Sequence, residues 1–196
     1  TAVGFGSNSK GYGSNAIGNS SVAKGNYSNA IGGSSVAEGN YSVALGQEAK
    51  TGPGKNFATA LGYQAQANGW ASFAQGAYAK ADGDESISIG DGSSATGNDT
   101  IAIGRSAKAD LEKAVALGFK AQANGWSSFA QGSFAKADGD KSISIGYSSS
   151  TATQAKDSVA IGSDAKTKDV NAIAIGTGAQ ATGKQSISVG TGNVVS

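Results

Sequence analysis

The 196-residue chain contains no cysteine, no histidine and no methionine, and it has a single proline. The lack of cysteine excludes disulfide bonds and thiolate chemistry, and the lack of histidine excludes an imidazole base and a histidine-ligated metal. Lys and Arg total 15 against 14 Asp and Glu, so the net charge of +1 gives no basic surface for nucleic acid or lipid. No apolar stretch is long enough to cross a bilayer as a helix.

Glycine is abundant, with 31 residues, and one set of glycines is regularly spaced. From Gly4 to Gly190 a glycine recurs every 14 residues, and only two intervals are longer, by two residues each. A fixed period of this length is typical of a solenoid, in which each repeat buries its surface against the next. We therefore predict one domain over residues 1–196 with about 13 coils and two-residue insertions within 47–61 and 147–161.

Small side chains alternate with larger ones on both sides of each repeat glycine. In Ser42-Val43-Ala44-Leu45-Gly46 the small residues alternate with aliphatic ones, whereas after a glycine they alternate with polar ones. This period of two predicts an all-β coil with two short strands, whose small side chains face a thin interior. Most 14-residue repeats carry a second glycine, such as Gly25, and we expect it to adopt a left-handed conformation in the turn.

The aliphatic positions form a stripe along the predicted solenoid. Monomers rarely expose apolar patches of this size, so we predict that identical stripes meet in a symmetric assembly. The expected contact residues are Ile17, Ile31, Val43, Leu45, Leu61, Phe73, Gln75, Ile87, Ile89, Ile101, Ile103, Val115, Leu117, Phe129, Gln131, Ile143, Ile145, Val159, Ile161, Ile173, Ile175, Ile187 and Val189. The polar positions of the stripe are Asn15, Asn29, Thr59, Gln75 and Gln131. They either hydrogen-bond to their symmetry mates or mark a wider, wetter axis.

Two nearly identical segments, residues 65–90 and 121–146, place Trp70 and Trp126 at equivalent turns. Exposed tryptophans are common anchors at interfaces, but they can equally cap the seam between neighbouring chains. Further candidate ligand contacts lie on the polar face and in the insertions, where a merely solvated surface would look the same; they are Lys55, Lys80, Lys136 and Gln154.

No catalytic or metal-binding constellation is found, so neither an enzyme nor a cofactor is predicted. The Asp-Gly-Asp segments 82–84 and 138–140 match no known calcium loop, and turn chemistry explains them better. A hexapeptide-repeat acyltransferase has the wrong period and would need a histidine, and the ranked threonines of an ice-binding solenoid are missing.

The repeat itself is recognisable in Asp157-Ser158-Val159-Ala160-Ile161-Gly162-Ser163-Asp164-Ala165. It resembles the Ser-Val-Ala-Ile-Gly-x-x-Ser-x-Ala-x-Gly repeat of YadA-type heads of trimeric autotransporter adhesins, and the resemblance covers essentially the whole chain. It implies a left-handed parallel β-roll and a homotrimer. It also implies display on a coiled-coil stalk above a trimeric β-barrel in the outer membrane of a Gram-negative-type bacterium.

The resemblance further implies non-catalytic, multivalent attachment to host extracellular-matrix or cell-surface proteins, or to other bacterial surfaces. Neither a stalk nor an anchor is present in the sequence, so we expect a head fragment whose membrane anchoring depends on C-terminal parts of a longer protein. The alternative is a rigid structural spacer within a surface fibre, with no ligand of its own.

Overall fold

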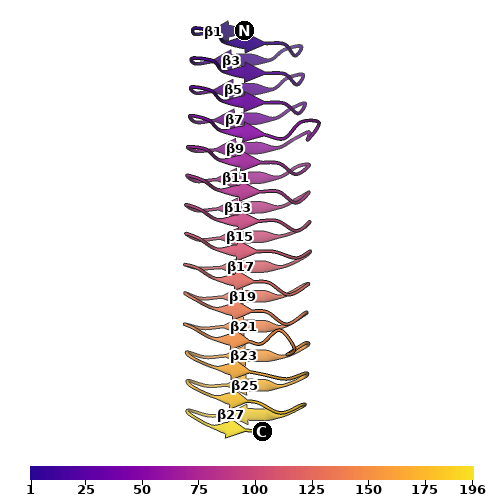
Figure 1. Ribbon diagram of the computed structural model, residues 1–196, viewed down its shortest axis with the longest axis vertical. Helices are drawn as coiled ribbons and strands as arrows, with labels where there is room; N and C mark the ends of the chain where they lie inside the picture. Colours follow the sequence, from indigo (N-terminus) through magenta and orange to yellow (C-terminus); the bar gives the residue numbers. More distant parts are fainter. The chain divides into compact units, whose positions relative to one another are not determined.

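A computed structural model describes residues 1–196 as two compact units, Thr1–Asp99 and Thr100–Ser196. Each unit is a parallel β-solenoid, and the two together comprise about 14 turns (Figure 1). In every turn the chain contributes one strand to each of two sheets, so the predicted all-β solenoid is confirmed. The chain forms no helix with the length and apolar character needed to span a bilayer.

In the first unit the odd-numbered strands form one sheet and the even-numbered strands the other. The odd-numbered strands are β1 (Ala2–Val3), β3 (Asn15–Ile17), β5 (Asn29–Ile31), β7 (Val43–Leu45), β9 (Thr59–Leu61), β11 (Phe73–Gln75) and β13 (Ile87–Ile89). The even-numbered strands are β2 (Asn8–Ser9), β4 (Val22–Ala23), β6 (Val36–Ala37), β8 (Lys50–Thr51), β10 (Gln66–Ala67), β12 (Lys80–Ala81) and β14 (Ser94–Ala95).

The second unit repeats this arrangement. Its odd-numbered strands are β15 (Ile101–Ile103), β17 (Val115–Leu117), β19 (Phe129–Gln131), β21 (Ile143–Ile145), β23 (Val159–Ile161), β25 (Ile173–Ile175) and β27 (Ile187–Val189). Its even-numbered strands are β16 (Lys108–Ala109), β18 (Gln122–Ala123), β20 (Lys136–Ala137), β22 (Ser150–Thr151), β24 (Lys166–Thr167), β26 (Gln180–Ala181) and β28 (Val194–Val195).

The strands of successive turns pair in parallel and in exact repeat register. Ala16 lies opposite Ala30, and Ala44 opposite Ala60 even though a two-residue insertion separates them. Equivalent positions are therefore stacked into columns that run along each unit. A side chain has as its axial neighbours the residues at the same position of the preceding and following coils.

The interior of each coil is as thin as the alternation of small residues predicts. Buried side chains are almost entirely Ala and Ser, and the largest that are fully buried are the threonines Thr100, Thr151 and Thr167. Most interior hydroxyls bond locally; Ser28, for example, donates to the carbonyl of Gly25 at 2.7 Å. The large aliphatic side chains cannot enter this interior and point outward.

The prediction for the second glycine of each repeat is wrong. Gly25 and its equivalents do not adopt a left-handed conformation; the residue two positions later does, as in Tyr27 with φ 55°. Its backbone N–H donates to the carbonyl of Tyr12 in the preceding coil at 2.7 Å, and this axial bond offsets the backbone strain. Gly25 is required for a different reason, because a Cβ there would lie 2.0 Å from the carbonyl oxygen of Gly39.

The two insertions lie in turns of the coil. Each follows an even-numbered strand, β8 or β22, and adds a small extra turn before the next odd-numbered strand (Figure 1). In the first, Lys55 N–H donates to the carbonyl of Gly52 at 3.2 Å; in the second, Ala155 N–H donates to the carbonyl of Ala152 at 2.9 Å. These bonds restore the normal course of the coil after the insertion.

Candidate functional site

The first candidate surface is the outer face of the odd-numbered strands. The middle residue of each three-residue strand is buried and the first and third point outward, as in β7, where Ala44 is buried and Leu45 is 46 % exposed. Every predicted contact residue of the aliphatic stripe occupies one of these outward positions, and none is buried within the chain. Within each unit the stripe is therefore a surface that the chain itself leaves uncovered.

Polar side chains interrupt this face in the first unit. Asn15 and Asn29 stand in register, and the Asn15 amide donates to Asn29 Oδ1 at 2.8 Å. Thr59 is half-buried, whereas Gln75 and its counterpart Gln131 in the second unit are exposed. Hydrogen bonds between these residues and symmetry mates remain a prediction.

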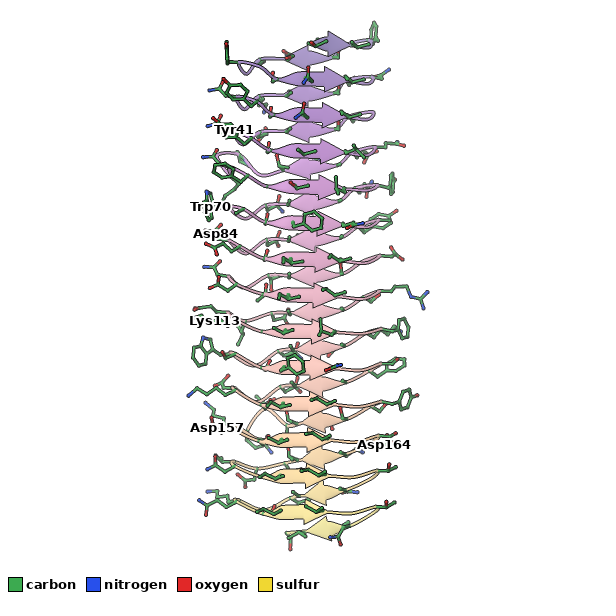
Figure 2. All side chains as sticks on the ribbon, turned by 180° about the vertical axis from the view of Figure 1, so that it is seen from behind. Tyr41, Trp70, Asp84, Lys113, Asp157 and Asp164 are labelled. Atoms are coloured by element: carbon green, nitrogen blue, oxygen red, sulfur yellow. The ribbon has the colours of Figure 1, made fainter.

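A second candidate surface lies along the turns that lead from each even-numbered strand to the next odd-numbered strand, here called the first corner. In the first unit, five aromatic rings stack there as a ladder, and they belong to Tyr12, Tyr27, Tyr41, Phe57 and Trp70. Neighbouring ring centroids are 5.3 to 6.1 Å apart, and Figure 2 shows Tyr41 and Trp70 along the same edge. Sequence reasoning found Trp70 but missed the ladder. The 14- and 16-residue spacing of Tyr27, Tyr41 and Phe57 was the available signal.

Trp70 is held in this corner by an acidic side chain from the next coil. Its backbone N–H donates to Asp84 Oδ1 at 2.6 Å, and Lys55 Nζ of the first insertion lies 2.8 Å from the same oxygen. Both contacts lower the pKa of the Asp84 carboxyl below its usual value of 3.8. The larger effect comes from Lys55 and the smaller one from the Trp70 N–H. Asp84 thus links the first-corner turns of three successive coils, and this pair of contacts is here called the Asp84 bracket.

The second unit contains the duplicate of this bracket with a different lysine. Trp126 N–H donates to Asp140 Oδ1 at 3.1 Å, and Lys156 of the second insertion lies 3.0 Å from Asp140 Oδ2. These two contacts lower the pKa of Asp140, with Lys156 the larger cause. Lys141 Nζ also lies 5.6 Å from the centre of the Trp126 ring. Both tryptophans keep about two-fifths of their surface exposed, at 41 % and 38 %.

The opposite turns, here called the second corner, contain the repeat glycines and shorter aromatic clusters. Tyr63 and Tyr78 meet edge to face at 5.3 Å in the first unit, and Tyr78 raises the pKa of the Tyr63 hydroxyl. In the second unit, Phe119 packs edge to face against Phe134 at 5.2 Å, and the Arg105 guanidinium lies 4.5 Å from the centre of the Phe119 ring. Figure 2 shows Asp157 and Asp164 on the two opposite corners of the second unit.

The third candidate surface is the outer face of the even-numbered strands. Lys80 pairs with Asp82 at 2.7 Å, and its duplicate Lys136 pairs with Asp138 at 2.8 Å. These two predicted contact residues are thus exposed but already paired with a carboxylate. The fourth polar candidate, Gln154, is exposed in the second insertion.

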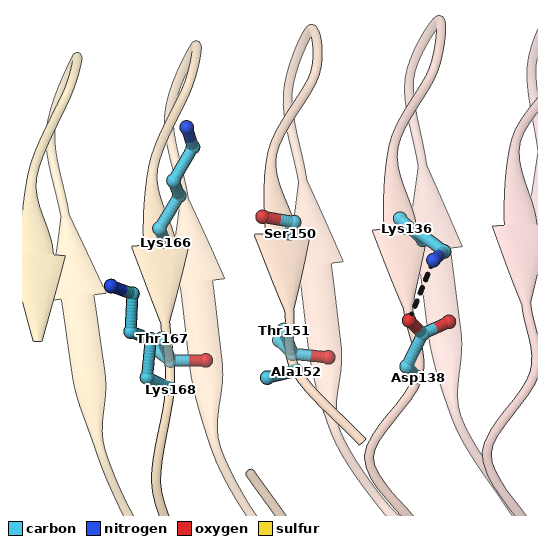
Figure 3. A pocket seen from close by; sticks show the side chains of 8 residues that line it. All are labelled: Lys136, Asp138, Ser150, Thr151, Ala152, Lys166, Thr167 and Lys168. Atoms are coloured by element: carbon cyan, nitrogen blue, oxygen red, sulfur yellow. Dashed lines mark ion pairs between the residues drawn. The ribbon is translucent and has the colours of Figure 1, made fainter. Parts of the chain in front are cut away.

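A shallow hollow of about 260 Å³ lies on this face of the second unit (Figure 3). Strands β20, β22 and β24 and the residues just after them line it, and Figure 3 shows the Lys136–Asp138 ion pair at one side. No group of three or more Asp and Glu side chains is placed to hold a metal ion.

These features define a class of protein, a parallel β-solenoid with an interior of small residues and an uncovered aliphatic face. A family model described as YadA head domain repeat (2 copies) matches this chain over most of its length. The matched residues are 9–35, 23–49, 55–69, 71–93, 95–121, 123–149, 154–179 and 168–193. The chain belongs to the YadA head domain family.

One similar solved structure is the collagen-binding domain of the Yersinia adhesin YadA. It is 27 % identical in sequence, with a TM-score of 0.44, and the match covers 91 % of this chain and 72 % of that one. No curated protein sequence matches the chain.

Proposed function

We propose that this chain is the head of a bacterial cell-surface adhesin, displayed on the outer membrane of a Gram-negative-type bacterium. The match of YadA head repeats to most of the chain carries the proposal. The head attaches the bacterium to host extracellular-matrix or cell-surface proteins, or to other bacteria, by binding without catalysis. Its repeated corners and outer faces offer many similar weak contacts in place of one deep pocket.

The working form in this proposal is a homotrimer of left-handed β-rolls. The aliphatic face supports self-association, because Leu45, Ile103 and Ile175 keep 46, 38 and 40 % of their surface exposed. Covering that remainder would contribute a little under half of the roughly 1.5–3 kcal/mol that fully burying such a side chain is worth. Three copies of each surface on one particle would raise avidity without any new contact. The interface consists of the aliphatic stripe, and the corners and the even-numbered strands remain free for ligands.

A rigid spacer is the second candidate, favoured by the near-identity of residues 65–90 and 121–146. Duplication of a four-coil block lengthens a solenoid without creating a new kind of surface. In this case the solenoid would hold another domain at a distance and bind nothing.

Attachment of coated particles separates the two candidates. Beads carrying the purified protein are compared with albumin-coated beads on surfaces bearing collagen, laminin or fibronectin, on cultured cells and on bacteria. If the chain is an adhesin head, beads coated with it should be retained on at least one of these surfaces. Beads coated with a Trp70→Ala/Trp126→Ala variant show whether the first corner contributes to the attachment. Retention no greater than that of albumin beads on every surface would leave the spacer as the function.

A further inference from the structure

The hollow in the second unit results from two short side chains between two rows of longer ones. Ser150 on β22 stands in register between Lys136 on β20 and Lys166 on β24. Two positions further along the same coils, Ala152 lies between Asp138 and Lys168. Since successive coils are about 4.8 Å apart, the outer rows are separated by about 10 Å, with only a hydroxyl and a methyl group between them.

The charge of the hollow is positive. Asp138 neutralises Lys136 at 2.8 Å, but neither Lys166 nor Lys168 forms an ion pair, so the walls carry a net charge of about +2. The Ser150 hydroxyl forms no hydrogen bond within the chain and remains available as a donor. Figure 3 shows Lys166 and Lys168 on the side of the hollow opposite the Lys136–Asp138 pair.

We propose that this hollow binds a sulfate or carboxylate group of an acidic polysaccharide. Two unpaired ammonium groups and a free hydroxyl supply the donors that such an oxyanion needs. No aromatic or branched aliphatic side chain lines the hollow, so it lacks the anchor pocket on which tight protein interfaces depend. The inference rests on the proposed adhesive function and names the chemical class of one of its ligands.

The test measures the affinity of the purified protein for a size-defined heparin oligosaccharide and for its desulfated form. Lys166→Gln/Lys168→Gln removes the two unpaired charges, and Ser150→Gln fills the hollow without changing any charge. Glutamine is tolerated at the Ser150 and Lys166 positions, because Gln66, Gln122 and Gln180 occupy them in other coils. Lys50→Gln is the matched control, since Lys50 stands at the Ser150 position of the other extended coil.

We expect the double lysine variant to bind the sulfated oligosaccharide at least about tenfold more weakly than the wild type. Losing one hydrogen bond to a charged group already reduces affinity by about this factor. Ser150→Gln should also weaken binding, and Lys50→Gln should not. Raising the salt concentration should reduce the affinity of the wild-type protein, because salt screens the attraction between the lysines and the oxyanion.

Several results would overturn the site: no binding by the wild-type protein, equal binding of the desulfated form, or an equal loss in Lys50→Gln. Binding of a DNA duplex as tight as that of the oligosaccharide would show a general attraction for polyanions and reject it as well. The bead assay reports separately on the adhesive function. Beads that attach to proteins while the oligosaccharide fails to bind would reject this site alone.

Discussion

At the scale of single residues, two columns of glycine allow the coils to stack, and they do so for different reasons. The repeat glycines combine a positive φ with close contact; Gly18, at φ 131°, would place a Cβ 2.6 Å from the carbonyl oxygen of Gly32. Gly25 and its equivalents have an ordinary conformation, and only the contact with the next coil requires the absence of a side chain. Substitutions can therefore separate steric cost from backbone strain.

Gly25→Ala tests the steric requirement. The new methyl group would overlap the backbone of Gly39, with its Cβ 2.0 Å from the oxygen and 2.3 Å from the carbon of the carbonyl group. Because backbone cannot move aside as a flexible side chain can, we expect a loss of about 3 kcal/mol or more in the free energy of unfolding, measured by urea denaturation. The control is Gly33→Ala, whose φ is not positive and whose nearest contact is 4.0 Å away. It should change stability by less than about 0.5 kcal/mol, and equal losses in both variants would contradict the steric explanation.

The Asp84 bracket predicts a dependence of stability on pH. Its pKa is lowered in the folded state from an ordinary value of 3.8, mainly by Lys55. Its stabilising contribution is therefore fully present above about pH 5 and is lost as the pH falls through 3.8 toward the lower folded-state pKa. Asp84→Asn keeps an acceptor for Trp70 N–H, as Asn98 does for Asp84 N–H in the following coil. The melting temperature of this variant should fall less between pH 5 and pH 3 than that of the wild type, and identical slopes would show that the bracket contributes nothing.

At the scale of elements, the aromatic ladder links the turns of five successive coils in the first unit. Tyr41 lies at its centre, stacked on Tyr27 at 5.3 Å and on Phe57 at 5.4 Å. Each such pair contributes about 0.5–1.5 kcal/mol beyond the area it buries. Tyr41→Ala removes two such pairs and should therefore lower the free energy of unfolding by about 1–3 kcal/mol in urea titrations. Tyr41→Phe keeps the ring and should stay within about 0.5 kcal/mol of the wild type. If removing the ring costs no more than removing the hydroxyl, the ladder is not a source of stability.

The strands were predictable from the sequence, whereas the corners were less so. Alternation of small and large residues, as in Val43-Ala44-Leu45, fixes which side chains face the interior, because only Ala, Ser and Thr fit there. The left-handed residue of each turn was not predictable, because its strain is offset by an axial hydrogen bond that exists only once the coils are stacked. Tyr27 and Tyr41 take that position although glycine would adopt the conformation more easily.

The candidate sites were also predictable to different degrees, because some of them depend on how neighbouring coils stack. The aliphatic stripe follows from composition and period, and the structure leaves every one of its members at least partly exposed. The hollow beside Lys166 follows from short side chains at two outward positions in one coil and longer ones in its neighbours. That comparison becomes meaningful only when the register across the 16-residue repeat is known.

At the scale of the whole molecule, the uncovered aliphatic stripe is the feature with the largest consequence. A chain of 19.1 kDa with this stripe in each unit should associate in solution, and we expect a molar mass near three chains by light scattering over a range of concentrations. Leu61→Asp places a carboxylate in the stripe, and in a symmetric trimer three of them would meet in a desolvated environment. We expect this variant to dissociate into single chains, since an unpaired buried charge costs about 3 kcal/mol or more. Gln66→Asp adds the same charge to the outer face of the other sheet in the same turn, and it should leave the mass unchanged. A folded wild-type monomer at all concentrations, or equal behaviour of the two variants, would contradict association through this face.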